Sequence, residues 1–109
     1  MKHLILILIV QILFAASAIA AGDVAAGKEK SQTCVACHGE SGISPTPQFP
    51  NIAGQYEDYL YVSLSGYKSG ERKNAIMSGI VAALNDQDMK DLAAYYSSLD
   101  GLYKLGLPE

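Results

Sequence analysis

Apolar and polar positions alternate at helical spacing along two stretches of the chain. Between residues 55 and 67 one face recurs at three- and four-residue steps and comprises Tyr56, Tyr59, Leu60, Ser63, Leu64 and Tyr67. A second face begins near residue 86 and comprises Met89, Leu92, Ala93, Tyr96 and Leu99, with Tyr95 at its edge. This spacing is typical of amphipathic helices, and no stretch gives a clear strand signal. The pattern therefore predicts an all-α fold.

Turn and capping residues predict where these helices begin and end. Gly70 is expected to end the first amphipathic helix, because helices commonly end at a glycine in the left-handed conformation. Asn85 is expected to cap the second helix, and Gly101 to end it. A third and shorter helix is predicted over residues 24–33, with Asp23 as its cap.

The first 20 residues differ in composition from the rest of the chain. Lys2 precedes an apolar run, and small residues follow it. These are the parts of a secretory signal peptide, and residues 18–20 fit its cleavage site. The apolar run is short for a membrane span of about 20 residues, so an uncleaved anchor is the less favoured alternative. We predict a signal peptide over residues 1–20 and one mature domain over residues 21–109.

Cleavage would leave 109 − 20 = 89 residues and would lower the basic count from 8 to 7 against 11 acids, for a formal charge of −4. Such a chain has no basic stripe, so nucleic acid is not an expected partner. Stable insertion into a membrane is not expected either once the apolar run is removed. Domains this small rarely build a sufficient core without a disulfide, metal or cofactor. The composition therefore favours a bound group at the centre of the fold.

Cys34, Cys37 and His38 form a Cys-x-x-Cys-His motif, which is typical of covalent c-type haem attachment. Cysteines three residues apart on a helix face the same way and can form thioether bonds to the haem, with the histidine as an iron ligand. A zinc site would need four ligands, and neither Cys nor His follows the motif. We predict one covalent haem c, with a redox dithiol as the remaining alternative.

The second axial ligand of the iron is inferred by elimination. His3 would leave with the signal peptide, so His38 is the one histidine expected in the mature chain and cannot pair with another. The remaining candidates are the thioethers of Met77 and Met89, or an open site. Met89 lies on the apolar face of the last helix, where packing already explains it. Met77 lies in a loop or short helix over residues 74–83, so we favour it as the ligand; a thioether there would raise the reduction potential.

Two further residues are candidates for contacts with the haem. Residues 39–50 are rich in Gly, Ser and Pro and predict an irregular loop. An iron-ligating histidine usually donates its other ring N–H to a carbonyl, which Pro50 can supply. Spacing alone favours an ordinary loop proline over this role. Arg72, in the polar turn before Met77, can pair with a haem propionate or lie in solvent.

The motifs together resemble class I cytochrome c, in particular the small bacterial cytochromes of the c-553 type and the single domains of dihaem cytochromes. The matching segments cover most of residues 22–99 and are residues 22–28, 34–39, 49–55, 67–72, 84–88 and 91–96. The resemblance implies that the N-terminal and C-terminal helices cross around a covalently bound haem. It places Gly27 at this crossing, beside Tyr95. Many relatives carry an aromatic residue shortly after this glycine, where the present chain has Lys30 and Ser31, so we expect a thinner contact.

The resemblance also assigns roles to the candidate site residues. It implies that Pro50 supplies the carbonyl that orients His38 and that Met77 is the distal ligand. The implied function is periplasmic one-electron transfer by a carrier that is not itself an enzyme. Its expected partners are periplasmic or membrane redox proteins.

An alternative within the same family is the cytochrome subunit of a flavin-dependent sulfide dehydrogenase, or flavocytochrome c, which would pair with a flavoprotein. Residues 42–44 and 72–74 are similar to such subunits. A free carrier would instead dock through a basic cluster of Lys68, Arg72 and Lys73, because local charge steers association even on an acidic protein. The acids are expected to be spread over the surface, at Glu40, Glu57, Asp58, Asp86, Asp88 and Asp91.

Overall fold

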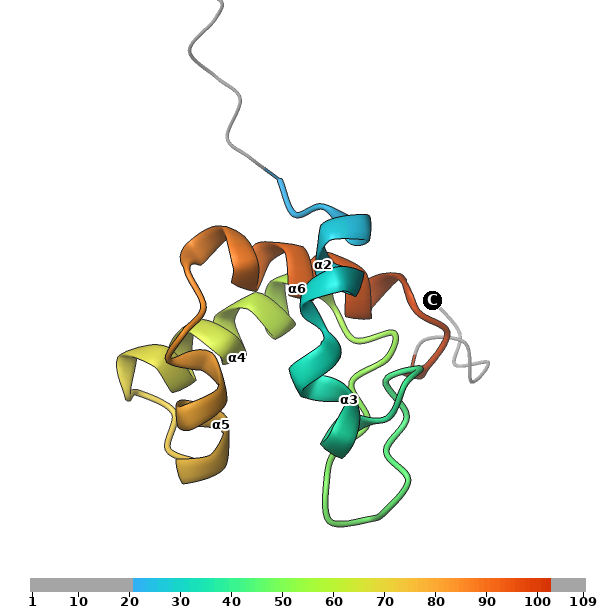
Figure 1. The fold of residues 1–109 in the computed structure, drawn as a ribbon, viewed down its shortest axis with the longest axis horizontal. Coiled ribbons are helices and arrows are strands. Elements are labelled where there is room, and N and C mark those ends of the chain that lie inside the picture. Colours follow the sequence, from blue (N-terminus) through green and yellow to red (C-terminus); the bar gives the residue numbers. More distant parts are fainter. Residues whose placement is uncertain (1–20, 103–109) are drawn as a thin grey trace, which may run out of the picture.

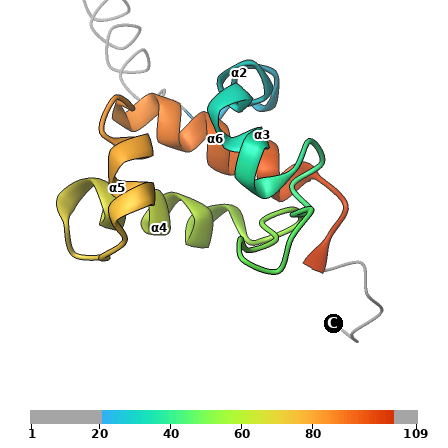
Figure 2. The same ribbon diagram turned by 60° about the horizontal axis from the view of Figure 1, so that its bottom comes forward.

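The computed structural model describes residues 21–102, so the predicted signal peptide lies outside the described residues. Residues 21–102 form helices α2 (Val24–Lys30), α3 (Gln32–His38), α4 (Glu57–Ser69), α5 (Ala75–Val81) and α6 (Asp86–Ser98) and contain no strand (Figure 1). The predicted all-α fold is confirmed for this part of the chain. Figure 2 shows α2 and α3 on one side of α6, and α4 and α5 on the other. No helix within the described range is long and apolar enough to cross a membrane.

The first helix is divided where the sequence predicted continuity. Asp23 caps α2 as expected, because its side chain accepts a hydrogen bond from the Ala26 N–H at 2.8 Å. The helix then stops at Ser31, whose hydroxyl donates to the Lys28 carbonyl at 2.7 Å. A serine that bonds back to its own helix competes with the regular ladder. The predicted helix over residues 24–33 was therefore wrong at its end, and a second helix, α3, carries the chain to His38.

Helix α2 crosses α6 at a glycine, as the resemblance implied. A Cβ atom at Gly27 would lie 2.0 Å from the Asp91 carbonyl oxygen and 2.7 Å from the Tyr95 Cβ. Real atoms do not approach so closely, so only glycine permits this separation of the two helices. The cost of a helix-interior glycine, about 1 kcal/mol relative to alanine, is thus offset by close packing.

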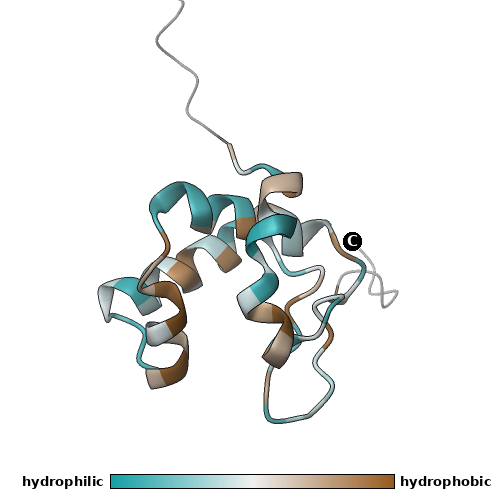
Figure 3. Cartoon of the chain, in the orientation of Figure 1, coloured by the Kyte–Doolittle hydropathy of each residue, from teal (hydrophilic) through white to brown (hydrophobic). Residues whose placement is uncertain are grey.

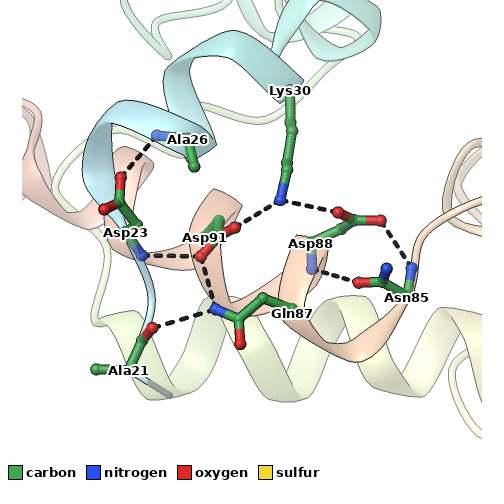
Figure 4. Close-up of polar contacts among 8 residues, drawn as sticks. All are labelled: Ala21, Asp23, Ala26, Lys30, Asn85, Gln87, Asp88 and Asp91. Carbon is green, nitrogen blue, oxygen red and sulfur yellow. Dashed lines mark hydrogen bonds and ion pairs between the residues drawn. The ribbon is translucent and has the colours of Figure 1, made fainter.

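A network of polar side chains joins the two helices beside this crossing (Figure 4). The Lys30 ammonium contacts Asp91 at 2.5 Å and Asp88 at 2.9 Å. Asp91 also accepts hydrogen bonds from the Asp23 N–H and from the side-chain amide of Gln87, each at 2.8 Å. Ion pairs therefore join α2 to α6 at this position, where the resemblance had led us to expect a thinner contact.

Asp91 was expected on the surface, yet it is only 3 % exposed. Burial alone would raise the pKa of this carboxyl, but Lys30, the Asp23 N–H and Gln87 outweigh it and leave the pKa below its ordinary value. The pKa of Asp88 is also lowered, by Lys30 and by the Asn85 N–H. Both groups are thus held in their charged form by partners on the protein.

The core lies where α4 packs on α6, and it comprises Leu60, Leu92, Ala93, Tyr95 and Tyr96. The predicted buried face of α6 is confirmed at Met89, Leu92, Ala93 and Tyr96, while Leu99 is half-buried. The apolar face of α4 behaves differently, because Tyr56 and Tyr59 are 65 % and 51 % exposed. Figure 3 shows hydrophobic residues on α3, α4 and α5 and a hydrophilic start to α6.

The ends of α4 and α6 agree only in part with the prediction. Gly70 ends α4 in the left-handed conformation, with φ of 84°. Asn85 caps α6 in a full capping box with Asp88, but the helix ends at Ser98 and not at Gly101. The Tyr96 carbonyl there accepts from the Gly54 N–H at 2.9 Å. A Cβ at Gly101 would lie 1.9 Å from the Ala53 carbonyl oxygen, so this glycine serves close packing of the C-terminal segment on the loop.

Candidate functional site

A cavity of about 430 Å³ opens between α3, the loop that follows it, α4, α5 and α6. Its lining includes every residue that the sequence singled out for a site, which are Cys34, Cys37, His38, Pro50, Arg72 and Met77. Met89, the alternative ligand, is not among the lining residues; it is 5 % exposed and packs in the core. The fold thus gathers residues that lie up to 77 − 34 = 43 positions apart in the sequence.

Helix α3 presents the two thiols to this cavity. Cys34 and Cys37 are both half-buried and are not joined to each other by a disulfide. Burial is the main influence on the Cys34 thiol and raises its pKa, which disfavours the reactive thiolate. Their separation by one helical turn directs both sulfur atoms to the same side of α3. This arrangement suits attachment of a single group at two points.

His38 is the last residue of α3 and is only 7 % exposed. Its Nδ1 lies 2.8 Å from the Pro50 carbonyl oxygen, so Nδ1 carries the proton and donates it. The other ring nitrogen, Nε2, is then left with a lone pair to bind a metal ion.

Polar contacts within the loop fix the position of Pro50. Asn51 accepts from the Ser44 N–H at 2.7 Å, and the Ser44 hydroxyl donates to the Cys37 carbonyl at 3.1 Å. The Ile52 and Ala53 N–H groups both donate to the Gly42 carbonyl, at 2.9 Å and 3.0 Å. The loop therefore has a defined shape although it contains no regular structure.

Met77 reaches the cavity from helix α5. It is half-buried, and its N–H donates to the side-chain oxygen of Asn74 at 3.0 Å. Helices α3 and α5 are well separated in both Figure 1 and Figure 2, so His38 and Met77 approach the cavity from different sides. Asn74 was not predicted from the sequence as a residue of the site. An Asn immediately before a helix is a capping signal. Helix α5 is too short to give a periodic pattern, so the sequence did not show that a helix begins after Asn74.

Arg72 is held against α4 at the edge of the cavity. Its guanidinium donates to the hydroxyls of Tyr67 at 2.9 Å, Ser63 at 3.2 Å and Tyr59 at 3.3 Å. It also lies over the Tyr67 ring, 5.0 Å from the centroid. The pKa of Tyr59 is lowered by its hydrogen bond to this cation. Protein groups thus hold the Arg72 side chain at the edge of the cavity. Its pairing with a haem propionate stays a prediction.

The cavity has the chemistry expected of a haem site. One imidazole and one thioether lie on different helices, and two thiols lie beside the imidazole. The Tyr96 hydroxyl is buried without a hydrogen-bond partner among residues 21–102, which is unusual for a folded protein. Burial, together with the adjacent Cys34, raises the pKa of Tyr96 above its ordinary value. A large apolar group with an iron centre fits this donor set, whereas no cluster of three or more His, Cys, Asp or Glu side chains suited to a bare metal ion occurs in the described range.

Comparison with known proteins agrees with this chemistry. The family model described as cytochrome c matches residues 24–100. Cytochrome c4 of Pseudomonas aeruginosa is 44 % identical over 98 residues, which are 90 % of this chain and 49 % of that protein. Cytochrome c-554(548) of Halomonas halodenitrificans is 48 % identical over 81 residues, which are 72 % of this chain and 98 % of that protein. The thiosulfate dehydrogenase electron acceptor of Thiomonas intermedia is 40 % identical over 76 residues, 69 % of this chain and 35 % of that protein.

A solved structure shares the fold as well as the sequence. The crystal structure of reduced recombinant cytochrome c4 from Pseudomonas stutzeri superposes with a TM-score of 0.71 at 45 % identity, over 75 % of this chain and 48 % of that chain. The present chain thus spans about half the length of the cytochromes c4 that it matches, consistent with the resemblance to one domain of a dihaem cytochrome. The family model, the relatives and the fold lead to one conclusion: the chain belongs to the cytochrome c family, whose domain holds a covalent haem c.

Proposed function

We propose that this chain is a periplasmic electron-transfer protein that carries one electron at a time. The observation that carries the proposal is that Cys34 and Cys37 line the same cavity as His38 and Met77. The cysteines would hold haem c through two thioether bonds, and the imidazole and the thioether would be its axial ligands. When bound, haem c supplies a reversible one-electron iron couple. The predicted signal peptide over residues 1–20 and a mature domain over residues 21–109 fit export to the periplasm, the proposed location.

The residues around the cavity would favour the reduced state and restrict the chemistry to electron transfer. The hydrogen bond from His38 to Pro50 orients the imidazole and selects Nε2 as the iron ligand. A thioether from Met77 supports ferrous iron and raises the reduction potential. With both axial positions taken, a substrate has no open site on the iron, so we infer a carrier and not a catalyst.

The basic cluster proposed for partner docking is smaller than the sequence suggested. Lys68 donates to the Ala82 carbonyl at 3.0 Å, and Arg72 is bound to the tyrosines of α4. Lys73 is exposed, and no hydrogen bond or ion pair to it is seen within residues 21–102. Lys73 is therefore the best probe of electrostatic docking to a redox partner.

A second candidate is an electron-accepting subunit of an oxidoreductase complex. The name of the Thiomonas relative, thiosulfate dehydrogenase electron acceptor, favours this class. The flavocytochrome alternative from the sequence belongs to the same class and would add a flavoprotein partner. A subunit would stay bound to its enzyme through gel filtration at high salt, whereas a free carrier would elute alone.

The ligand assignment is tested by two methionine variants of the haem-loaded protein. Met77→Ala is expected to abolish the weak long-wavelength sulfur-to-iron absorption band of the oxidised protein and to lower the reduction potential. Met89→Ala should keep the band and reduce stability by about 2–5 kcal/mol, as for a buried methionine truncated in a core. Loss of the band in Met89→Ala, with the band intact in Met77→Ala, would reverse the assignment.

Attachment is tested by the double variant Cys34→Ala/Cys37→Ala, made alongside the normal protein in cells that attach c-type haem. The normal protein should keep haem on a denaturing gel, and the variant should lose it. If the normal protein instead carries no haem and its two thiols form a reversible dithiol couple, the dithiol alternative is supported.

A further inference from the structure

Helix α5, which carries Met77, has little intrinsic reason to be a helix. It spans only Ala75–Val81, and isolated helices shorter than about 12 residues are marginal in water. Its sequence includes the β-branched residues Ile76, Ile80 and Val81 and a glycine at position 79, all poor helix formers. Contacts from outside the helix must therefore hold it in place.

The first of these contacts is at the N-terminus of α5. Asn74 has an extended backbone, with φ of −159° and ψ of 117°, and its side-chain oxygen accepts from the Met77 N–H at 3.0 Å. Its backbone carbonyl accepts from the Ser78 N–H at 2.9 Å. One residue thus binds the backbone of Met77 and of its neighbour. Asn74 also lines the cavity.

Other contacts tie α5 to the last turn of α4. The Lys68 ammonium donates to the carbonyl of Ala82, the C-cap of α5, at 3.0 Å. The Ser78 hydroxyl donates to the Tyr67 carbonyl at 3.3 Å. Only Val81 of this helix is fully buried, so few apolar contacts assist these hydrogen bonds. The position of Met77 therefore depends on a small set of polar ties.

We propose that Asn74 is a positioning residue for the axial thioether, because its side chain fixes the backbone of Met77 at the cavity. The inference rests on the proposed function, in which Met77 is a ligand of the iron. Without the cap, the first turn of α5 opens more often, and the Met77 side chain spends more time away from the cavity. An external ligand can then compete for the iron position. Lys68 also holds α5 in place, from its C-terminal end, through the hydrogen bond to the Ala82 carbonyl.

The chain offers a matched control at the other Asn-capped helix. Asn85 caps α6 in the same manner, since its side-chain oxygen accepts from the Asp88 N–H at 2.8 Å. It does not line the cavity. Asn74→Ala and Asn85→Ala therefore remove the same kind of hydrogen bond, from a helix that carries the proposed ligand and from one where Met89 lies in the core. Asn74→Ser keeps a capping oxygen and serves as the rescue variant.

The experiment measures imidazole binding to the oxidised haem-loaded protein, together with the long-wavelength sulfur-to-iron band. Asn74→Ala is expected to bind imidazole about tenfold more tightly than the normal protein, the change that loss of one N-cap predicts. Asn74→Ser should return to within about twofold of the normal protein, because serine caps nearly as well. Asn85→Ala should lower the urea midpoint while leaving imidazole affinity and the band unchanged.

The outcomes separate failure of the inference from failure of the proposed function. If Met77→Ala abolishes the band but Asn74→Ala binds imidazole no better than Asn85→Ala, the positioning role is overturned while the ligand assignment stands. If the band survives Met77→Ala, the ligand assignment fails and the inference fails with it. Should Asn74→Ala not fold, Lys68→Met tests the same helix from its C-terminal end. A rise in imidazole affinity supports the proposal, and an unchanged affinity contradicts it.

Discussion

Helices α2 and α5 are both seven residues long, and an Asx side chain caps each of them, yet they are held in very different ways. Helix α2 lies against α6 at Gly27, and its Lys30 joins a buried carboxylate, Asp91, that has three protein partners. Helix α5 lies on α4 with Ile76 60 % and Ile80 38 % exposed. The first helix is thus secured by the protein alone, whereas the second is held loosely beside a cavity.

This difference has a functional meaning because each helix leads to one of the two proposed axial ligands. Helix α2 continues into α3 and so fixes the attachment motif and His38 relative to the core. The exposed apolar residues of α5 line the cavity, so a bound haem would cover them and complete their packing. We therefore expect disruption of the crossing to unfold the whole domain, and disruption of α5 to act mainly on the ligand position.

The largest expected effect is at the glycine of the crossing. Gly27→Ala would place a methyl group 2.0 Å from the Asp91 carbonyl oxygen, and the two helices would have to separate. We expect a loss of more than about 3 kcal/mol in the free energy of unfolding, measured by urea denaturation of the haem-loaded protein.

The matched control is Gly79→Ala in α5, where nothing lies within 4 Å of the added methyl group. The free energy of unfolding of this variant should rise by about 0.5–1 kcal/mol, because alanine is the better helix former. Equal losses in both variants would show that the two helices are held alike and would refute the comparison.

The next effect concerns the buried carboxylate of the crossing. Asp91→Asn removes the charge that Lys30, the Asp23 N–H and Gln87 surround, and leaves donors facing an amide. Loss of one member of a buried and hydrogen-bonded charge group predicts a cost of about 2–4 kcal/mol. Urea denaturation measures this cost, and the long-wavelength band should survive in the folded variant. Loss of the band without loss of stability would contradict the division of roles between the two regions.

The same network predicts how stability depends on pH. The pKa values of Asp91 and Asp88 are lowered in the folded protein, so their contribution is fully present above the ordinary carboxyl pKa of about 3.9 and is lost as pH falls through the lower folded values. The pKa of Lys30 is raised, chiefly by Asp88 and Asp91, so its contribution is lost only above about pH 10.5.

Urea midpoints recorded from pH 7 to pH 2 check this dependence. They should fall on acidification in the normal protein and less steeply in Asp91→Asn. Parallel curves for the two proteins would argue that other carboxylates are responsible for acid unfolding.

Local patterns in the sequence predicted most of the helices and the attachment motif. The caps at Asp23 and Asn85 and the stop at Gly70 follow from the chemistry of single residues, and all three are present in the structure. The buried face of α6 follows from helical spacing and is confirmed. Such features depend on neighbours within one or two turns of the chain, which a sequence displays directly.

Features that depend on distant contacts could not be predicted in this way. Asp91 looks like a surface charge in the sequence, because nothing near it indicates that Lys30, 61 positions earlier, will meet it. The tyrosine partners of Arg72 were missed for a similar reason, since only the packing of the turn against α4 brings them together. The break at Ser31 was missed because the serine hydroxyl bonds back to the Lys28 carbonyl and so competes with the regular helix, and the sequence does not show which hydrogen bond forms.

The smallest expected effect concerns the surface beside α5. Lys73 is exposed next to Arg72, which lines the cavity, so its charge should steer redox partners without altering the fold. Steering is a rate effect that salt screens over about 10 Å at 0.1 M ionic strength. We expect Lys73→Glu to slow oxidation by the anionic reagent ferricyanide a few-fold at low salt, with the difference vanishing at high salt and the reduction potential unchanged. Lys28→Glu, an equal charge change at an exposed site on α2, which contributes no residue to the cavity lining, should have a smaller effect. If the two variants slow the reaction equally, only net charge matters, and the α5 side of the molecule is not the route by which electrons leave.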